Sequence, residues 1–90
     1  MFGLTGQLRR AVISVPSNIA EGHGRLSDKG FAVFLGQARG SLFEAETQLE
    51  LASSLGYFPA DKLPALLEQC EKITRMLNSL LKTLRSDAKQ

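Results

Sequence analysis

The sequence predicts an all-α protein, an antiparallel up-and-down helical bundle with three helices in this chain. Two long segments carry apolar residues at alternating steps of three and four, the spacing that places them on one face of a helix. A shorter segment near the start of the chain carries a similar apolar stripe. The connections between the segments are short, and short connections favour antiparallel packing of neighbouring helices.

The first predicted helix covers about residues 4–22 and contains a proline. Its apolar stripe consists of Leu4, Leu8, Ala11, Val12, Val15 and Ile19. An internal proline removes one backbone hydrogen bond and usually kinks a helix. The stripe keeps its phase across Pro16, which favours one continuous helix with a kink at that residue. Asn18 and Glu21 have the spacing of a capping box, so a new helix that starts after the proline is the alternative.

The second predicted helix covers residues 28–56. Its apolar positions are Phe31, Leu35, Ala38, Leu42, Ala45, Leu49, Ala52 and Gly56. Ser27 precedes the helix and is a residue type that caps helix N-termini. Gly56 can adopt the left-handed conformation that ends many helices, and Pro59 lies just beyond it.

The third predicted helix covers residues 61–86. Its apolar positions are Leu63, Leu66, Cys70, Ile73, Leu77, Leu80 and Leu84. Asp61 is the expected N-terminal cap. Pro64 falls in the first turn, where its missing N–H costs least.

The length and composition indicate a single domain over residues 1–90. A chain of 90 residues builds only a thin core, so assembly into an oligomer is a natural way to bury more apolar surface. No apolar run approaches the roughly 18 residues of a membrane span, and the first residues lack the apolar middle of a secretory signal. We therefore expect a cytoplasmic protein without a membrane partner.

The charges are sorted along the chain. Residues 1–43 hold five basic and two acidic residues, a net charge of +3. Residues 44–71 hold one basic and six acidic residues, a net charge of −5. Residues 72–90 hold five basic residues and one acidic residue, a net charge of +4. In an antiparallel bundle this order predicts an acidic pole near the turn at residues 57–58. It predicts a basic pole where the end of the third helix lies beside residues 25–29.

The residues that carry chemistry are too few to assemble an active site. Cys70 is the single cysteine and falls on an apolar stripe, and His23, the single histidine, stands between two glycines. No nucleophile, base and orienting group can be combined from the sequence. We expect no enzymatic activity, no metal site and no cofactor.

Five basic residues are the candidates for nucleic-acid binding: Arg9, Arg10, Arg25, Lys29 and Arg39. Phosphate contacts through such side chains would be electrostatic and tolerant of base sequence. Five later residues could extend the basic patches, namely Lys72, Arg75, Lys82, Arg85 and Lys89. The alternative is an ordinary solvated face, with Arg9 and Arg10 paired to Glu44 or Glu46. In that case the protein would be a scaffold that binds only other proteins.

Six further residues are expected to serve packing within or between chains: Pro16, Ser17, Asn18, Gly36, Gly40 and Ser41. Ser17 and Asn18 would satisfy the backbone carbonyl groups freed by the proline, or present a polar surface to a partner. Gly36 and Gly40 each cost about 1 kcal/mol relative to alanine inside a helix, so close approach of another helix should offset that cost. Ser41 would bond to a helix carbonyl or meet the same neighbour.

The segments "LTGQLRR", "SVPSNIAEG" and "ARGSLFEAETQL" resemble a bacterial four-helix bundle protein family. Its first members are encoded in intervening sequences of large-subunit ribosomal RNA genes, and the accessory variability determinant of diversity-generating retroelements is similar to them. The resemblance spans about residues 4–86. It implies a bundle that assembles into a homopentameric barrel and, in the retroelement branch, a basic surface that binds nucleic acid and a reverse transcriptase.

Two features depart from the family pattern. The family has an amphipathic helix before "LTGQLRR" that this sequence lacks, so we expect three helices and an exposed apolar groove that another chain could fill. The second departure is Gly30, where the family often has an acidic residue, which weakens the capping box that begins at Ser27.

Overall fold

The computed structural model describes residues 2–25 and 27–88, and the described chain consists of three long helices. Helix α1 spans Phe2–His23, α2 spans Asp28–Ser54 and α3 spans Leu63–Ala88. A short 3-10 helix, η1, spans Ala60–Lys62 and leads into α3. The described residues contain no strand, and the all-α helical bundle predicted from the sequence is confirmed.

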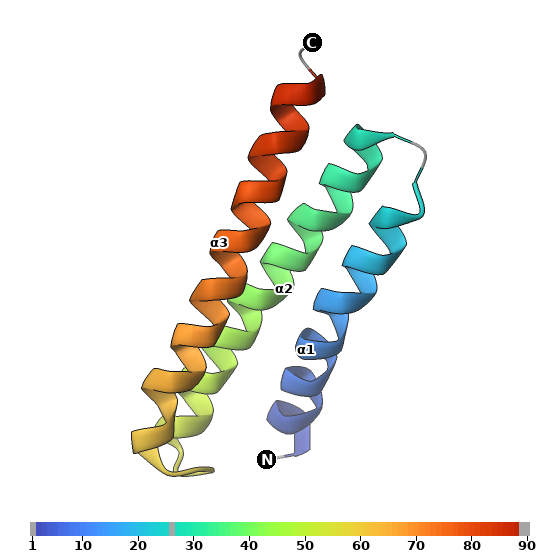
Figure 1. Cartoon of the computed structure of the whole chain (residues 1–90). Coiled ribbons are helices and arrows are strands. Elements are labelled where there is room, and N and C mark those ends of the chain that lie inside the picture. Colours follow the sequence, from blue (N-terminus) through green and yellow to red (C-terminus); the bar gives the residue numbers. More distant parts are fainter. Residues whose placement is uncertain (1, 26, 89–90) are drawn as a thin grey trace.

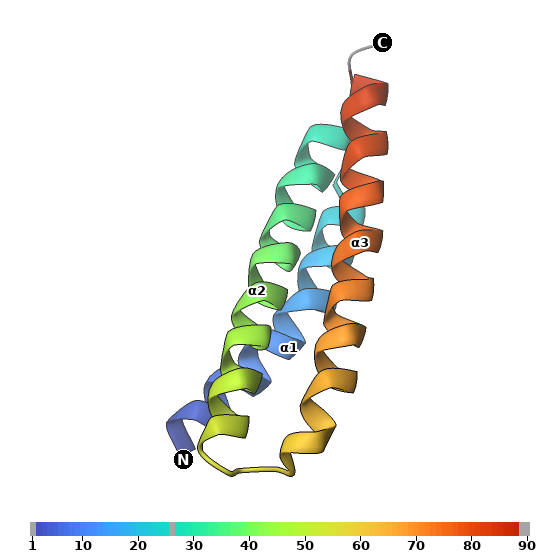
Figure 2. The same cartoon turned by 90° about the vertical axis from the view of Figure 1, so that its left-hand side faces the viewer.

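Helix α2 lies between the other two helices and packs against both (Figure 1). The three helices run up, down and up, so that the α1–α2 turn and the last turns of α3 lie at one end (Figure 2). The beginning of α1 and the connection between α2 and α3 lie at the other end. The molecule is an elongated slab of 50 × 22 × 13 Å.

The core is built around α2, whose Leu35 is completely buried. The core cluster consists of Val15, Leu35, Ala38, Leu42, Leu77, Leu81 and Leu84. Small side chains on α2 bring the helices close together, since Ala38, Ala45 and Ala52 are all buried. At the upper end of α1 the contact is closer still: a Cβ atom on the buried Gly22 would lie 2.7 Å from the Cβ atom of Phe34.

Both ends of α2 are capped by the residues that the sequence indicated. The Ser27 hydroxyl oxygen accepts a hydrogen bond from the Gly30 N–H at 3.1 Å. Gly56 has a φ of 76°, its N–H donates to the Ser53 carbonyl and the Tyr57 N–H donates to the Ala52 carbonyl, each at 3.0 Å. This pair of bonds is a Schellman motif. The helix itself ends at Ser54, two residues before the predicted end.

Helix α1 is continuous through Pro16, so the alternative of a second helix that starts after the proline is wrong. The proline leaves the Val12 carbonyl without its usual donor. Asn18 does not supply one, because its side-chain amide donates to the Ser14 carbonyl and to the Ser14 hydroxyl, each at 2.8 Å. The expectation that Asn18 satisfies the freed carbonyl is therefore also wrong.

The buried face of α3 is rotated from the predicted one. Leu81, absent from the predicted stripe, is 4% exposed, whereas Leu80, which was predicted to face the core, is 37% exposed. Leu66 and Ile73 are also partly exposed, as is Val12 on α1. The reason is that α3 packs mainly on α2 alone, so that only one edge of its broad apolar surface is covered. Asp61 lies inside η1 and does not cap α3.

Candidate nucleic-acid interface

The five predicted cationic residues lie in three separate places. Arg9 and Arg10 are exposed on the first half of α1, whereas Arg25 and Lys29 are exposed at the α1–α2 turn. Because a helix rises 1.5 Å per residue, Arg10 lies about 20 Å from the end of α1. The structure therefore does not bring the two pairs together. Arg39 is on α2, partly buried.

Arg25 is held by two neighbours at the α1–α2 turn. Its guanidinium donates a hydrogen bond to the Glu21 carboxylate at 2.8 Å, and both side chains are about half exposed. The same guanidinium carbon lies 4.6 Å from the centre of the Phe34 ring, which is the geometry of a cation–π contact. Arg25 therefore stabilises the turn as well as contributing positive charge. Lys29 follows on the first turn of α2.

The Arg39 side chain is directed at α3, where its guanidinium donates to the Asn78 side-chain oxygen at 2.7 Å. Helices α2 and α3 are antiparallel, so residues after Asn78 lie beside residues before Arg39. Lys82 and Arg85 are therefore level with the first turns of α2. The structure gathers Arg25, Lys29, Lys82 and Arg85 at one end of the bundle, which we call the basic end. Lys89, which the sequence also suggested for a basic patch, lies outside the described residues.

Arg9 and Arg10 do not form the ion pairs that the alternative interpretation requires. Across residues 2–25 and 27–88, the ion pair found is Arg25–Glu21. Arg10 and Glu44 do line one polar depression of about 450 Å³ between α1 and α2, together with Gln7 and Ser41. No salt bridge joins the Arg10 and Glu44 side chains.

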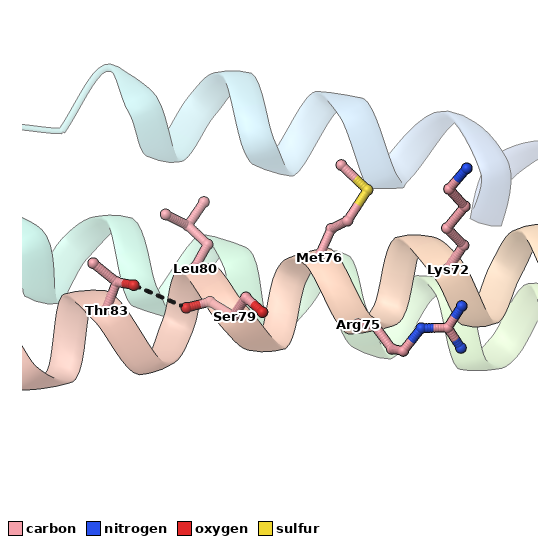
Figure 3. A pocket seen from close by; sticks show the side chains of 6 residues that line it. All are labelled: Lys72, Arg75, Met76, Ser79, Leu80 and Thr83. Atoms are coloured by element: carbon pink, nitrogen blue, oxygen red, sulfur yellow. Dashed lines mark hydrogen bonds between the residues drawn. The ribbon is translucent and has the colours of Figure 1, made fainter.

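Two further cations lie on the exposed part of α3. Lys72 and Arg75 border an open depression of about 630 Å³ with Met76, Ser79, Leu80 and Thr83 (Figure 3). In this view Lys72, Met76 and Leu80 extend from the side of α3 on which the pale blue ribbon of α1 is drawn. The depression is thus a mixed basic and apolar surface on one helix.

Glu46, Glu50 and Glu71 lie away from the basic end, where α2 and α3 face each other, whereas Glu21 and Asp28 lie at the basic end itself. The pKa of Glu46 is raised, first by partial burial and then by the negative charges of Glu71 and Glu50. The pKa of the Cys70 thiol is raised for the same reasons, burial followed by Glu46 and Glu71. A phosphate backbone would be repelled from this side of the molecule.

The residues predicted to serve packing form one polar contact between α1 and α2. The Ser14 and Ser41 hydroxyl oxygens lie 2.8 Å apart, and the Asn18 amide donates to Ser14. Ser41 thus meets a neighbouring helix, one of the two roles expected for it. Ser14 was missed, although its position four residues before Asn18 places both side chains on one face of the helix. Ser17 is exposed on α1.

Gly36 and Gly40 do not accommodate a helix of the same chain. A Cβ atom on either glycine would meet nothing within 4 Å. Close approach of a helix therefore remains a prediction that only another chain could fulfil.

An apolar groove runs between α1 and α3 with α2 as its floor, as expected for a bundle of three helices. It has a volume of about 460 Å³ and is lined mainly by aliphatic side chains, among them Leu8, Val12, Leu49, Leu66 and Ile73. Cys70 also lines it. Among the described residues, no group of three potential ligands lies close enough to hold a metal ion, and none of the described helices is long and apolar enough to cross a bilayer.

Comparison with known proteins identifies a family to which the chain is similar. The model of a family described as 23S rRNA-intervening sequence protein matches residues 1–79, which is most of the chain. The match includes α1, α2 and the first two thirds of α3. No curated protein matches the chain.

Proposed function

We propose that this chain, which belongs to the 23S rRNA-intervening sequence protein family, is a non-catalytic, self-associating module that binds RNA or DNA through its basic surface. The observation that carries the proposal is the basic end, where Arg25, Lys29, Lys82 and Arg85 collect from three segments of the chain. Glu21 and Asp28 also lie at this end, but the four cations outnumber them, and the acidic cluster of Glu46, Glu50 and Glu71 lies elsewhere and would repel phosphate.

The binding mode would be electrostatic and tolerant of base sequence. The aromatic side chains near the basic end are already engaged, since Phe34 lies under Arg25 and Phe31 meets the His23 ring edge-on at 5.9 Å. They are not free to stack on bases, which is the usual second component of single-strand binding. Contacts to phosphate through Lys and Arg would therefore supply most of the affinity.

Arg9 and Arg10 would form a second contact on the same ligand. They lie about 20 Å along α1 from the basic end, a span that an extended strand of several nucleotides covers. Both are exposed and have no ion-pair partner among the described residues. In an oligomer the number of such contacts is multiplied, and modest patches on each copy become sufficient.

The test is fluorescence anisotropy with a labelled 20-nucleotide RNA and a labelled DNA duplex, each titrated at several salt concentrations. The variant Lys29→Gln/Lys82→Gln/Arg85→Gln removes three charges but leaves Arg25, which stabilises the turn. We expect the slope of log affinity against log salt to become shallower by about 0.7–0.9 for each phosphate contact removed, thus by about 2–3 in total.

Two variants control the experiment. Lys62→Gln removes one charge at the far end of the bundle and should leave binding unchanged, whereas Arg9→Gln/Arg10→Gln tests the second contact. If neither the RNA nor the DNA binds wild-type protein at low salt, the nucleic-acid function is wrong. The alternative is then a scaffold that binds proteins, which the apolar groove between α1 and α3 favours.

A further inference from the structure

The apolar surface of the groove between α1 and α3 extends along more than half of α3. The groove is lined by positions between residues 8 and 16 of α1 and between residues 66 and 73 of α3. Beyond them on α3 follow Met76 and Leu80, which are 63% and 37% exposed. Figure 3 shows both extending from the side of α3 on which α1 is drawn. From Leu66 to Leu80 the apolar strip measures about 21 Å along the helix axis.

The groove is open because α1 and α3 each pack mainly on α2. Val12 and Ile73 line it from opposite walls, and yet 54% of Val12 and 39% of Ile73 are exposed. Single apolar residues scattered over a surface are ordinary, whereas a concave strip with aliphatic side chains on both walls is typical of a binding groove. An occupant would bury the exposed parts of these side chains.

The walls of the groove are shaped to receive a helix. Both walls are helices themselves, and each presents a row of apolar residues at a step of four followed by a step of three: Leu8, Val12 and Val15 on α1, and Leu66, Cys70 and Ile73 on α3. Such rows form the ridges between which the side chains of a neighbouring helix pack. A small apolar molecule would fill only part of the strip, whereas a helix of about 14 residues covers its whole length.

The rims of the groove carry positive charge. On α1, Arg9 follows Leu8 and lies two turns before Pro16, so it borders the groove. On α3, Lys72 precedes Ile73 and extends from the side on which α1 is drawn (Figure 3). Both side chains are exposed, and among the described residues no acidic side chain lines the groove. An occupant with acidic residues at both edges would complement these cations.

We propose that the groove binds an amphipathic α-helix of another polypeptide, with aliphatic residues on one face and glutamate or aspartate along both edges of that face. The aliphatic face would cover Val12 and Ile73, as in the helix-in-groove mode of peptide recognition. The acidic edges would meet Arg9 and Lys72. Since α1 and α3 run in the same direction (Figure 1, Figure 2), an occupant antiparallel to both has a favourable dipole interaction with each wall.

The groove is a different site from the basic end, and its occupation sets no number of copies for an assembly. Arg9 is the residue that it shares with the proposed nucleic-acid contacts. The two proposals fail separately, because anisotropy with labelled nucleic acid reports on one and the thiol of Cys70, which lines the groove, reports on the other.

The test uses this thiol, because Cys70 is a free cysteine. The probe is a synthetic peptide of about 14 residues, with leucines at steps of three and four and glutamates along both edges of the leucine face. The rate at which a maleimide labels Cys70 is measured at one pH and low salt with increasing peptide. At ten times the dissociation constant the rate should fall about tenfold, since only the free groove exposes the thiol.

The charges are tested by exchange. A second peptide, with lysine in place of each glutamate, should bind wild-type protein about tenfold more weakly at low salt, because attraction at both rims becomes repulsion. The variant Arg9→Glu/Lys72→Glu should reverse this preference. The variant Lys29→Gln/Lys82→Gln/Arg85→Gln should keep it, because its substitutions lie at the basic end and not at the groove.

The apolar contact is tested by a matched pair of substitutions. Val12→Glu places a carboxylate inside the groove and should weaken binding of the acidic peptide by more than about tenfold. Val33→Glu adds the same group on α2 at a position that is equally exposed, 53% against 54%, but lies outside the groove, and it should leave binding unchanged. Circular dichroism confirms that both variants are folded.

Four results would each overturn the proposal. The acidic peptide leaves the labelling rate unchanged; both peptides protect Cys70 equally; or Val12→Glu binds the acidic peptide as tightly as Val33→Glu does. The fourth is labelling that slows as the protein concentration rises without peptide, because a second copy of the chain would then occupy the groove.

A disulfide experiment tests the orientation, in the variant Cys70→Ala/Leu80→Cys. An occupant antiparallel to α3 has its first turn near Leu80, so a peptide with a cysteine in its first turn should form the disulfide faster than one with a cysteine in its last turn. The two ends of the peptide are about 20 Å apart, which is too far for one position to reach both. The opposite order of rates would overturn the antiparallel arrangement.

Discussion

Gly22 is the residue at which the end of α1 contacts the start of α2. A methyl group there would lie 2.7 Å from the Phe34 Cβ atom and 2.9 Å from the Phe31 Cδ1 atom, and neither helix can move without disturbing the turn. We expect Gly22→Ala to lower the free energy of unfolding by about 1–3 kcal/mol through overpacking, although alanine is the better helix former. Urea denaturation followed by circular dichroism measures the change.

Gly3→Ala is the matched control, because a Cβ atom on Gly3 would meet nothing within 4 Å. It should change the free energy of unfolding by less than about 0.5 kcal/mol, as surface substitutions usually do. If Gly22→Ala proves as stable as Gly3→Ala, the two helices do not approach at Gly22 as closely as the structure has them.

At the residue scale, the sequence predicted which residues cap a helix better than it predicted which side chains meet between helices. Ser27 and Gly56 act as caps because capping depends on their own backbone and a few neighbours. The contact of Ser14 with Ser41 joins residues 27 positions apart, and only the relative placement of two helices decides it. The candidate cations were found by composition, but the engagement of Arg39 by Asn78 follows from tertiary structure alone.

At the scale of the helix, α3 shows where apolar periodicity is ambiguous. Leu80 and Leu81 are adjacent, and either can continue a stripe with steps of three and four. The predicted stripe, which includes Leu80, would suit a helix that packs against two neighbouring helices. In the described chain α3 packs mainly against α2, so Leu77, Leu81 and Leu84 are buried, whereas Leu80 borders the open depression that also contains Lys72 and Met76.

The two leucines therefore differ in what they contribute to stability. We expect Leu81→Ala to lower the free energy of unfolding by about 2–4 kcal/mol, because it leaves a cavity in the core. Leu80→Ala should cost less, about 1–2 kcal/mol, because a third of that residue is already exposed to solvent and no closed cavity is left. Thermal or urea denaturation at low protein concentration measures both. Equal losses would mean that the side of α3 that carries Leu80 is covered in solution.

At the scale of the whole molecule, the order of charges in the sequence becomes a division of the surface. The basic residues at the α1–α2 turn and the end of α3 lie at one end of the slab. Nearer the other end, partial burial and then the negative charges of Glu71 and Glu50 raise the pKa of Glu46. Antiparallel packing was sufficient to predict this division, because it depends on chain direction and not on which side chains touch.

The acidic cluster makes stability depend on pH with a definite sign. Since folding raises the pKa of Glu46, the folded protein binds a proton more tightly than the unfolded chain does. The associated stability is fully present below the pKa of the unfolded chain, and it is lost as pH rises through the higher pKa of the folded protein. Stability should therefore fall over the pH range just above the ordinary pKa of a glutamate, as Glu46 ionises in its partly buried position beside Glu71 and Glu50.

Glu46→Gln should remove this loss. The variant should match wild-type protein at about pH 3.5, below the ordinary glutamate pKa, and exceed it at pH 7 by a few tenths of a kcal/mol, the usual size of a like-charge repulsion between helix positions four apart. Denaturant titrations at both pH values measure the difference. Glu68→Gln removes one charge from an exposed position of α3 and should not reproduce the effect. A variant that is less stable than wild type at pH 7 would show that Glu46 is held there by the nearby Arg75 and not repelled by its acidic neighbours.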